Sequence, residues 1–415
     1  MNQTAAQRWR HCFAVLTALA TLILVGIGGL VTSHGVGMAV PDWPTSYGYN
    51  MFALPISTWL TGGIFHEHTH RVVATIVGTL VVALMRWLGG NASRRPLIII
   101  GMAEILAGLG LLAIGPDWKG AGHFLSGIGG VVLLAGIVWV KNQTAEGKLP
   151  TLGWWAFWLV QLQGLLGGLR VVLDAHIVAD VRLGTAFGIV HGCLGQAFLV
   201  LVAIIALMTS GWWHRFVQND FKPATGANEL PQSTLLRRWF LFATVLISAQ
   251  LLIGATMRHQ HAGLAIPDFP LAYGALWPDM STEAIAKYNL QRVEITEAHP
   301  ITAFQIALQM VHRIVALLIA AAVIVCWRKT SAGTPLRRVS ALWVGLILVQ
   351  VSLGAWTIWS NKAADVATAH VVVGALSLVT GAYGCLISFR RLTGNRFATA
   401  ADSASKTVLA DRISV

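Results

Sequence analysis

The chain is divided into ten apolar runs, each about as long as a helix that crosses the ~30 Å hydrocarbon core of a membrane. Only 11% of its residues are charged and its mean hydropathy is +0.66, whereas roughly a quarter of the residues in a soluble protein are charged. Since a segment in lipid must satisfy its own backbone hydrogen bonds, each run is expected to be a helix. We therefore predict an all-α polytopic membrane protein with spans near 12–33, 65–88, 96–115, 121–140, 152–173, 183–208, 238–257, 303–327, 338–359 and 366–389.

The basic residues predict how the chain is oriented. Most of the 29 lysines and arginines lie on one side of the membrane if the N-terminus is cytoplasmic, and the positive-inside rule then puts both termini in the cytoplasm. The net charge of +12 is gathered at helix ends rather than on one face, which argues against a nucleic-acid partner. The four cysteines lie in or beside apolar runs and form no CxxC motif, so neither a disulfide framework nor a zinc site is expected.

The two halves of the chain repeat each other in four blocks that occur in the same order. Gly37–Pro44 matches Gly263–Pro270, His70–Ala74 matches His312–Ala316, Gln163–Gly167 matches Gln350–Gly354, and His191 matches His370. This order predicts two pseudo-symmetric four-helix bundles in parallel repeat, with two inserted helices over 96–140. The expected units are a first bundle over 12–210, a cytoplasmic linker over 211–236, a second bundle over 237–390 and a disordered polar tail over 395–415.

Ionisable side chains inside a membrane are costly and usually functional. The repeated ones are four histidines, and each bundle carries one on its second core helix and one on its fourth: His70 and His191, then His312 and His370. Two histidines at similar depth on facing helices can supply both axial ligands of a haem iron, whereas zinc usually needs three or four protein ligands. The alternative is that these histidines are hydrogen-bonded residues of the helix packing. Their occurrence at four duplicated positions argues against this alternative.

One acidic residue breaks the symmetry of the two halves. Glu67 precedes His70 by three residues and shares its helix face, whereas Gln309 stands at the matching place before His312. A carboxylate can take up a proton or stabilise positive charge, so the first site is expected to be reactive and the second to hold a fixed cofactor. The alternative is that Glu67 only interacts with the start of its helix.

Further residues are weaker candidates. Arg71 and Arg313 follow the repeated histidines and are expected to pair with haem propionates, unless they reach to the membrane surface instead. Gly195 and Gly374 lie one turn after His191 and His370, where they would leave room for a flat macrocycle. Trp43 and Phe269 would cover the two sites or join an aromatic belt. The histidines without a repeat partner are expected to be interfacial or structural: His34, His66, His68, His123, His259 and His261.

Together, the Glu67-x-x-His70-Arg71 motif, the two Gly-x-Ala-x-Pro-Asp-(Trp/Phe)-Pro segments and the paired histidines resemble the haem A synthase family of bacteria and mitochondria. The resemblance extends over roughly 12–92 and 150–390. It implies a bacterial plasma-membrane enzyme with a fold of eight helices that oxidises the C8 methyl group of haem O to the formyl group of haem A. It also implies that His70 and His191, with Arg71, bind the substrate haem O. His312 and His370, with Arg313, would bind a resident haem b, and Glu67 would be the catalytic carboxylate.

The chain departs from this family in two respects. It lacks the outer-loop cysteine pair that some members carry, and it has two extra helices over 96–140. The resemblance further implies a haem O synthase and a terminal oxidase as partners, together with an electron acceptor that the sequence does not identify. Two other functions stay open at this stage: a di-haem membrane carrier that oxidises quinol, and a transporter built on the repeat without haem.

Overall fold

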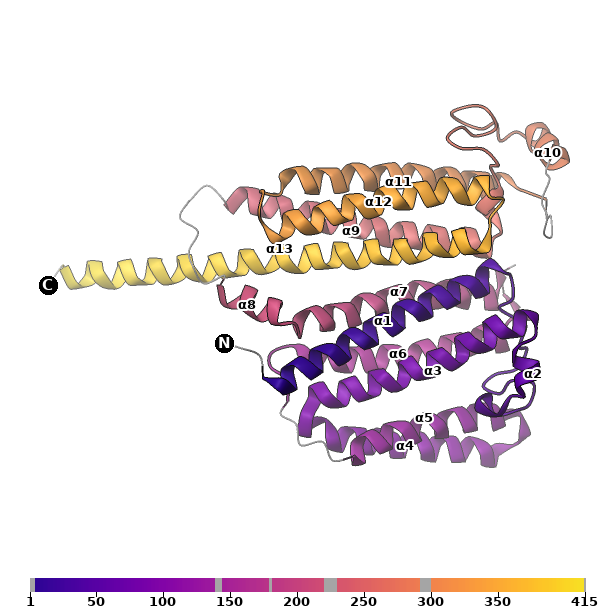
Figure 1. Ribbon diagram of the computed structural model, residues 1–415, viewed down its shortest axis with the longest axis horizontal. Helices are drawn as coiled ribbons and strands as arrows, with labels where there is room; N and C mark the ends of the chain where they lie inside the picture. Colours follow the sequence, from indigo (N-terminus) through magenta and orange to yellow (C-terminus); the bar gives the residue numbers. More distant parts are fainter. Residues whose placement is uncertain (1–3, 139–143, 179–180, 220–229, 292–299, 414–415) are drawn as a thin grey trace.

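The computed structural model describes residues 4–138, 144–178, 181–219, 230–291 and 300–413. Its long helices run roughly side by side (Figure 1). They are α1 (Ala5–Ser33), α3 (Gly62–Gly89), α4 (Arg94–Ile114), α5 (Lys119–Ile137), α6 (Leu149–Val172), α7 (Leu183–Met208), α9 (Leu230–His259), α11 (Ala303–Lys329), α12 (Pro335–Trp359) and α13 (Ala364–Ile413).

Shorter elements connect the long helices. They are the helices α2 (Ile56–Trp59), α8 (Gly211–Asn219) and α10 (Thr282–Gln291), the 3₁₀ turns Met51–Ala53, Gly90–Ser93, Pro116–Trp118 and Ala262–Leu264, and the two-residue strands β1 (Ile177–Val178) and β2 (Val181–Arg182). The strands form an antiparallel pair in which Val178 is opposite Val181. This pair is the only sheet in the part of the chain that the structure describes.

The described residues contain nine segments that are long and apolar enough to cross a membrane. One of them, Gly62–Ile114, contains both α3 and α4, which are separated by the 3₁₀ turn Gly90–Ser93. When these two helices are taken separately, the structure has a long helix at each of the ten predicted runs. The prediction of an all-α polytopic membrane protein is confirmed.

The helices form two four-helix bundles. In the first, α1, α3, α6 and α7 pack together, and in the second, α9, α11, α12 and α13 do so. The bundles meet where α13 contacts α1 and α7 and where α7 contacts α9. Arg258 of α9 crosses this interface and donates hydrogen bonds to Gly29 O and Ser33 Oγ of α1, each at 2.8 Å. Both termini lie at one end of the molecule, and residues 34–61 and 260–291 form the other end, called the loop end below (Figure 1).

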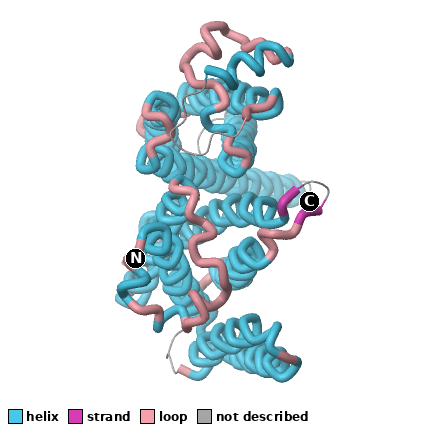
Figure 2. Tube along the Cα trace, turned by 90° about the vertical axis from the view of Figure 1, so that its right-hand side faces the viewer, coloured by secondary structure: helices cyan, strands magenta, loops and turns pink. Residues whose placement is uncertain are grey.

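The inserted helices form a hairpin on the outside of the first bundle, at the bottom of Figures 1 and 2. Glycines allow α4 and α5 to approach backbone to backbone: an ideal Cβ at Gly108 would lie 2.7 Å from Gly122 O, and one at Gly101 would lie 2.5 Å from Leu133 N. The buried Arg86 of α3 donates from Nε to Ala135 O of α5 at 3.2 Å. The hairpin is therefore attached to the bundle by a buried cation.

Two predicted segments contain helices. The expected linker over 211–236 includes α8 at 211–219 and the start of α9 at Leu230, and its residues 220–229 lie outside the described part. Trp213 of α8 is only 7% exposed and packs into the second bundle's apolar core, which explains why this segment is ordered.

The tail after Asn395 was expected to be disordered, and this expectation is wrong for the backbone, since α13 continues as a helix to Ile413. Residues 395–413 contain neither glycine nor proline and include several alanines, so their sequence favours a helix despite its polarity. The extended end of α13 projects beyond the bundles on the side of the termini (Figure 1).

We expect Gly108→Ala to lower the melting temperature of the protein in detergent, whereas Gly110→Ala should leave it unchanged or raise it slightly. A Cβ at Gly108 would lie 2.3 Å from Ser126 Oγ and 2.7 Å from Gly122 O, but one at Gly110 on the same helix would meet nothing within 4 Å. Overpacking costs about 1–3 kcal/mol, whereas alanine is by itself the better helix former. Equal melting temperatures of the two variants would contradict the close packing of α4 and α5.

Candidate functional site

The structure brings together the two members of each predicted histidine pair. The ring centroids of His70 on α3 and His191 on α7 are 6.4 Å apart, and those of His312 on α11 and His370 on α13 are also 6.4 Å apart. Histidine nitrogens bind first-row metals at about 2.0–2.1 Å, so two axial imidazoles on one metal have centroids roughly 6 Å apart. The described residues contain no group of three or more His, Cys, Asp or Glu that could hold a metal ion. Each site therefore offers two imidazoles and no further protein ligand.

Each imidazole lies against a glycine of a neighbouring helix. An ideal Cβ at these glycines would lie between 3.1 and 3.6 Å from the nearest ring atom. The two shortest of these distances are below ordinary van der Waals contact, and the other two are within it. The pairs are Gly28–His70 and Gly167–His191 in the first bundle, and Gly254–His312 and Gly354–His370 in the second. The glycines occupy matching positions of the two halves, Gly28 with Gly254 and Gly167 with Gly354, so each ring has the same kind of neighbour in both bundles.

A glutamine accompanies the fourth-helix histidine in each bundle. Gln350 Nε2 lies 3.4 Å from His370 Nε2. Gln163, with its amide oriented to satisfy its neighbours, donates to His191 Nδ1 at 2.8 Å. Of the two glycines expected to make room for a macrocycle, Gly195 faces open space, but a Cβ at Gly374 would lie 3.1 Å from Gln350 Nε2.

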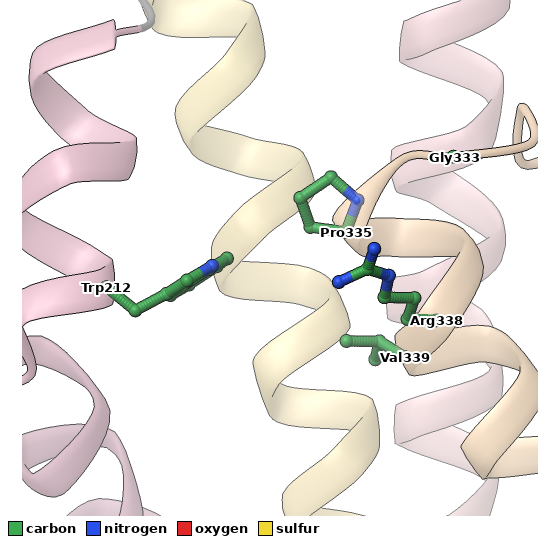
Figure 3. A pocket seen from close by; sticks show the side chains of 5 residues that line it. All are labelled: Trp212, Gly333, Pro335, Arg338 and Val339. Atoms are coloured by element: carbon green, nitrogen blue, oxygen red, sulfur yellow. The ribbon is translucent and has the colours of Figure 1, made fainter.

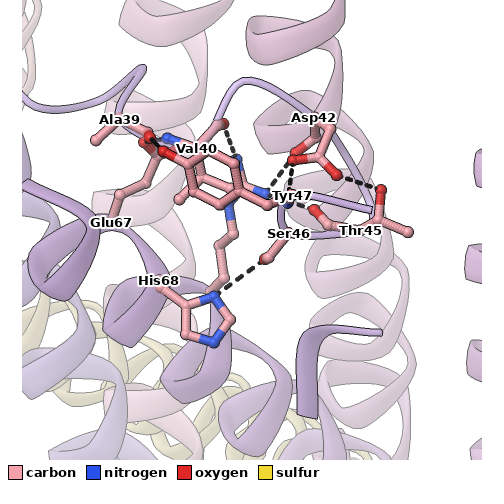
Figure 4. Close-up of polar contacts among 9 residues, drawn as sticks. Ala39, Val40, Asp42, Thr45, Ser46, Tyr47, Glu67 and His68 are labelled. Atoms are coloured by element: carbon pink, nitrogen blue, oxygen red, sulfur yellow. Dashed lines mark hydrogen bonds and ion pairs between the residues drawn. The ribbon is translucent and has the colours of Figure 1, made fainter. Parts of the chain in front are cut away.

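Glu67 of α3 binds the loop Gly37–Pro44 (Figure 4). Its Oε2 accepts a hydrogen bond from Val40 N at 2.8 Å, and its Oε1 forms an ion pair with Arg71 Nη2 at 2.7 Å. Gln309 has the same place in the second bundle, where its Oε1 accepts from Ile266 N at 2.7 Å. Both side chains are almost completely buried. The two residues therefore share a structural function, and they differ in charge.

The arginines that follow the histidines also bind these loops. Arg71 donates to the carbonyl oxygens of Val40, Asp42 and Thr45 at 2.7, 2.6 and 3.0 Å. Arg313 donates to those of Asp268 and Leu271 at 2.6 and 2.8 Å. A haem propionate would have to compete with these carbonyl groups for either guanidinium. The His-Arg motif did not predict that either arginine binds loop carbonyl groups, because the motif does not show how the loop folds back over the helix.

The two Pro-Asp-aromatic-Pro segments form the same hydrogen-bonded turn, in which the aspartate accepts from two backbone N–H groups. Asp42 accepts hydrogen bonds from Tyr47 N at 2.7 Å and Gly48 N at 2.9 Å, and Asp268 accepts the corresponding two in the second loop. Burial by itself raises the pKa of Asp42, but the hydrogen bonds from Gly48, Thr45 and Tyr47 outweigh it and leave the pKa below its ordinary value. The φ angles of Tyr47 and Gly48 are positive, at 53° and 78°. Glycine adopts a positive φ without strain, which explains why a glycine stands at position 48.

The aromatic residue of each loop lies against the third helix of its bundle. Trp43 covers Gly168 of α6, where a Cβ would lie 2.4 Å from its ring, and its centroid is 4.4 Å from that of Phe124 on the inserted helix α5. Phe269 instead lies 6.2 Å from Trp359 of α12. The inserted hairpin thus contacts the loop of the first site only.

The unrepeated histidines have various surroundings. His34 and His66 stack at 4.6 Å, and the buried His68 shares a hydrogen bond of 3.0 Å with Ser46 Oγ of the loop (Figure 4). His123 and His261 are exposed. His259, however, lies near the first site, and so does Arg170, which sequence reasoning counted only toward orientation. The sequence does contain a signal for Arg170, because a charged residue near the end of an apolar helix is often functional.

A cavity of about 250 Å³ lies elsewhere, between α8 and the start of α12 (Figure 3). Its lining includes Trp212, Pro335 and Arg338. This is the end of α12 opposite the loop end, so the cavity belongs to neither histidine pair.

Fold and site together define a multi-pass membrane protein with two paired-histidine sites inside a duplicated helical bundle. The chain belongs to the COX15-CtaA family, described as cytochrome oxidase assembly proteins, whose model matches residues 122–381. It is 24% identical to a heme A synthase of Geobacillus kaustophilus (88% of this chain, 86% of the relative). It is 22% identical to one of Shewanella oneidensis (88% and 92%) and 24% identical to one of Shouchella clausii (67% and 68%).

We expect Arg71→Gln to loosen the loop over the first site. The substitution removes hydrogen bonds to three carbonyl groups and the ion pair with Glu67, and hydrogen bonds to charged groups contribute about 1.5–3 kcal/mol each. Amide hydrogen exchange of residues 37–46 should therefore accelerate by about tenfold or more. Arg182→Gln, at an exposed position on the same end of the first bundle, is the matched control. Unchanged exchange in Arg71→Gln would show that the loop is held by other contacts.

Proposed function

We propose that this chain is a haem A synthase that oxidises a methyl group of haem O to the formyl group of haem A. The observation that carries the proposal is the asymmetry of two otherwise matching sites. Both present imidazoles at a centroid distance of 6.4 Å, and only the first has a carboxylate one helical turn from a ligand histidine. The similarity to heme A synthases of three bacteria supports the same function.

The second site suits a resident haem b, which would supply a redox-active iron when bound. His312 and His370 would be its ligands, and the Nδ1 atoms of both are buried without a hydrogen-bond partner in the described structure. The contact of each ring with Gly254 or Gly354 holds it between two helices. With Gln309 in place of a carboxylate, this site has no acid at the position of Glu67.

The first site suits the substrate, with His70 and His191 as ligands of the haem O iron. Converting a methyl to a formyl group adds an oxygen atom and removes protons and electrons, so positive charge must be stabilised or protons accepted near the reacting carbon. Glu67 supplies a carboxylate whose two oxygens are held by Val40 N and Arg71. Arg71 binds this carboxylate and also two carbonyl groups of the loop. The arginine therefore holds Glu67 and the loop in a fixed position relative to each other.

The proposal extends to the surroundings of the enzyme. Haem O enters from the membrane and its isoprenoid tail stays in lipid, in a bacterial plasma membrane with both termini of the chain in the cytoplasm. A haem O synthase would supply the substrate and a terminal oxidase would receive haem A. A haem b held by His312 and His370 would supply a redox-active centre for the electrons of this oxidation, and an electron acceptor outside the chain would be the redox partner.

We expect Glu67→Gln to abolish haem A formation while haem binding and stability are retained. The second bundle shows that glutamine accepts the same backbone hydrogen bond, so the substitution removes the charge but leaves the loop in place. Loss of a general acid or base lowers the rate by about 10²–10⁴-fold. Haem A is measured by pigment extraction from a haem-O-producing strain that lacks its own enzyme.

Gln309→Glu in the second bundle is the matched control and should leave haem A formation largely intact. Full turnover by Glu67→Gln would refute the assigned function of the carboxylate. Haem binding at both sites without any haem A from the unsubstituted chain would instead favour a di-haem electron carrier.

We expect His70→Ala and His312→Ala each to remove about half of the haem that the purified protein binds after reconstitution. The reason is that the two pairs lie in separate bundles, so loss of one ligand leaves the other site intact. The amount of haem per chain, from the Soret band and haem extraction, checks this. Unchanged haem content in either variant would exclude the corresponding histidine as a ligand.

A further inference from the structure

Arg170 lies at the end of α6 directly beneath the loop of the first site. Its guanidinium lies where Gly37 of the loop carries no side chain, since a Cβ there would lie 2.1 Å from Nη2; a Cβ at Gly188 of α7 would lie in ordinary contact with Nε, at 3.4 Å. Glu67 and Asp174 act on it electrostatically. Within the described part of the chain, however, Arg170 has no hydrogen bond or ion pair, unlike Arg71 and Arg258.

His259, the last residue of α9, joins Arg170 from the second bundle. A Cβ at Gly188 would lie 2.6 Å from His259 Cε1 and 3.0 Å from its Nε2, so both side chains lie against the same glycine. Gly188 precedes His191 by three residues and therefore shares its face of α7. The cation and the imidazole are thus placed one helical turn from a ligand histidine of the first site, toward the loop end.

The second bundle has no such arrangement. At the positions that match in the repeat, Thr357 stands for Arg170, Ser33 for His259 and Ala367 for Gly188. Gly263, the counterpart of Gly37, has nothing within 4 Å of an ideal Cβ. Thr357 donates its hydroxyl to Leu353 O in its own helix. At these matched positions the second bundle therefore carries no cation, and the arginine that acts on His370, Arg258 of α9, is instead hydrogen-bonded to α1.

A guanidinium removed from water needs an anion, and its planar fork matches a carboxylate. We propose that Arg170 and His259 bind a propionate carboxylate of the porphyrin held by His70 and His191; this rests on the proposed function. Two axial ligands leave a porphyrin free to rotate about the axis through the iron. A carboxylate fixed at Arg170 stops this rotation and so determines which edge of the ring faces Glu67. Arg170 is thus a positioning residue that selects the methyl group to be oxidised.

The test compares iron protoporphyrin IX with its dimethyl ester, which lacks both carboxylates. The full chain carrying His312→Ala and His370→Ala leaves only the first site, and binding is followed by the Soret band. We expect the acid to bind about tenfold more tightly than the ester. Adding Arg170→Thr, the residue of the second bundle, should abolish this difference, whereas Arg170→Lys should retain part of it. Arg182→Gln should leave it unchanged, and melting temperatures show whether each variant is folded.

The outcomes separate this inference from the proposed function. Equal binding of acid and ester, or a difference that persists in folded Arg170→Thr, would overturn the assignment of Arg170 while leaving the first site as a haem site. Should neither porphyrin bind to the chain with the second pair removed, the proposed substrate site itself would be wrong, and the carboxylate site with it. A difference abolished by Arg170→Thr and partly kept by Arg170→Lys supports the proposal.

Discussion

Both sites depend on the close approach of imidazole rings to helix backbones that carry no side chain at the point of contact. Histidine is costly in a membrane, and a ring is tolerated between helices only where the neighbouring helix leaves room for it. Gly28 in the first bundle and Gly354 in the second provide this room, because a Cβ there would lie 3.1 and 3.2 Å from a ring atom; at Gly167 and Gly254 a Cβ would be in ordinary contact with the ring. The equal centroid distance of 6.4 Å in both bundles follows from this shared arrangement. The spacing of each histidine pair is thus a property of the helix packing.

The sequence predicted the helices and the histidine pairs well, because both leave periodic or duplicated signals. Apolar runs of membrane length identify the long helices, and the repeat aligns His70 with His312 and His191 with His370. The loop contacts of Glu67 and Arg71 escaped prediction, since they depend on how residues 37–46 fold back over α3. Neither the catalytic interpretation of Glu67 nor the alternative contact with its helix start predicted the hydrogen bond to the loop, which Gln309 makes equally well.

Arg170 and His259 leave no signal of this kind. Neither has a counterpart of its own type in the other half of the chain, and their proximity depends on how α6, α7 and α9 pack around Gly188. The helical tail was missed because polar composition was weighed above helix propensity, although residues 395–413 lack glycine and proline. In a duplicated protein, the positions where the halves differ are therefore as informative as those where they agree.

The inserted hairpin gives the first loop a support that the second lacks. Phe124 of α5 packs on Trp43, and a Cβ at Gly120 would lie 2.9 Å from Pro44 Cδ. The loop of the first site is therefore clamped from two directions, by the side chains of α3 beneath it and by α5 beside it. A substitution in α5 can therefore alter the packing of this loop without touching either imidazole of the first pair, and the loop of the second bundle has no comparable neighbour among the described residues.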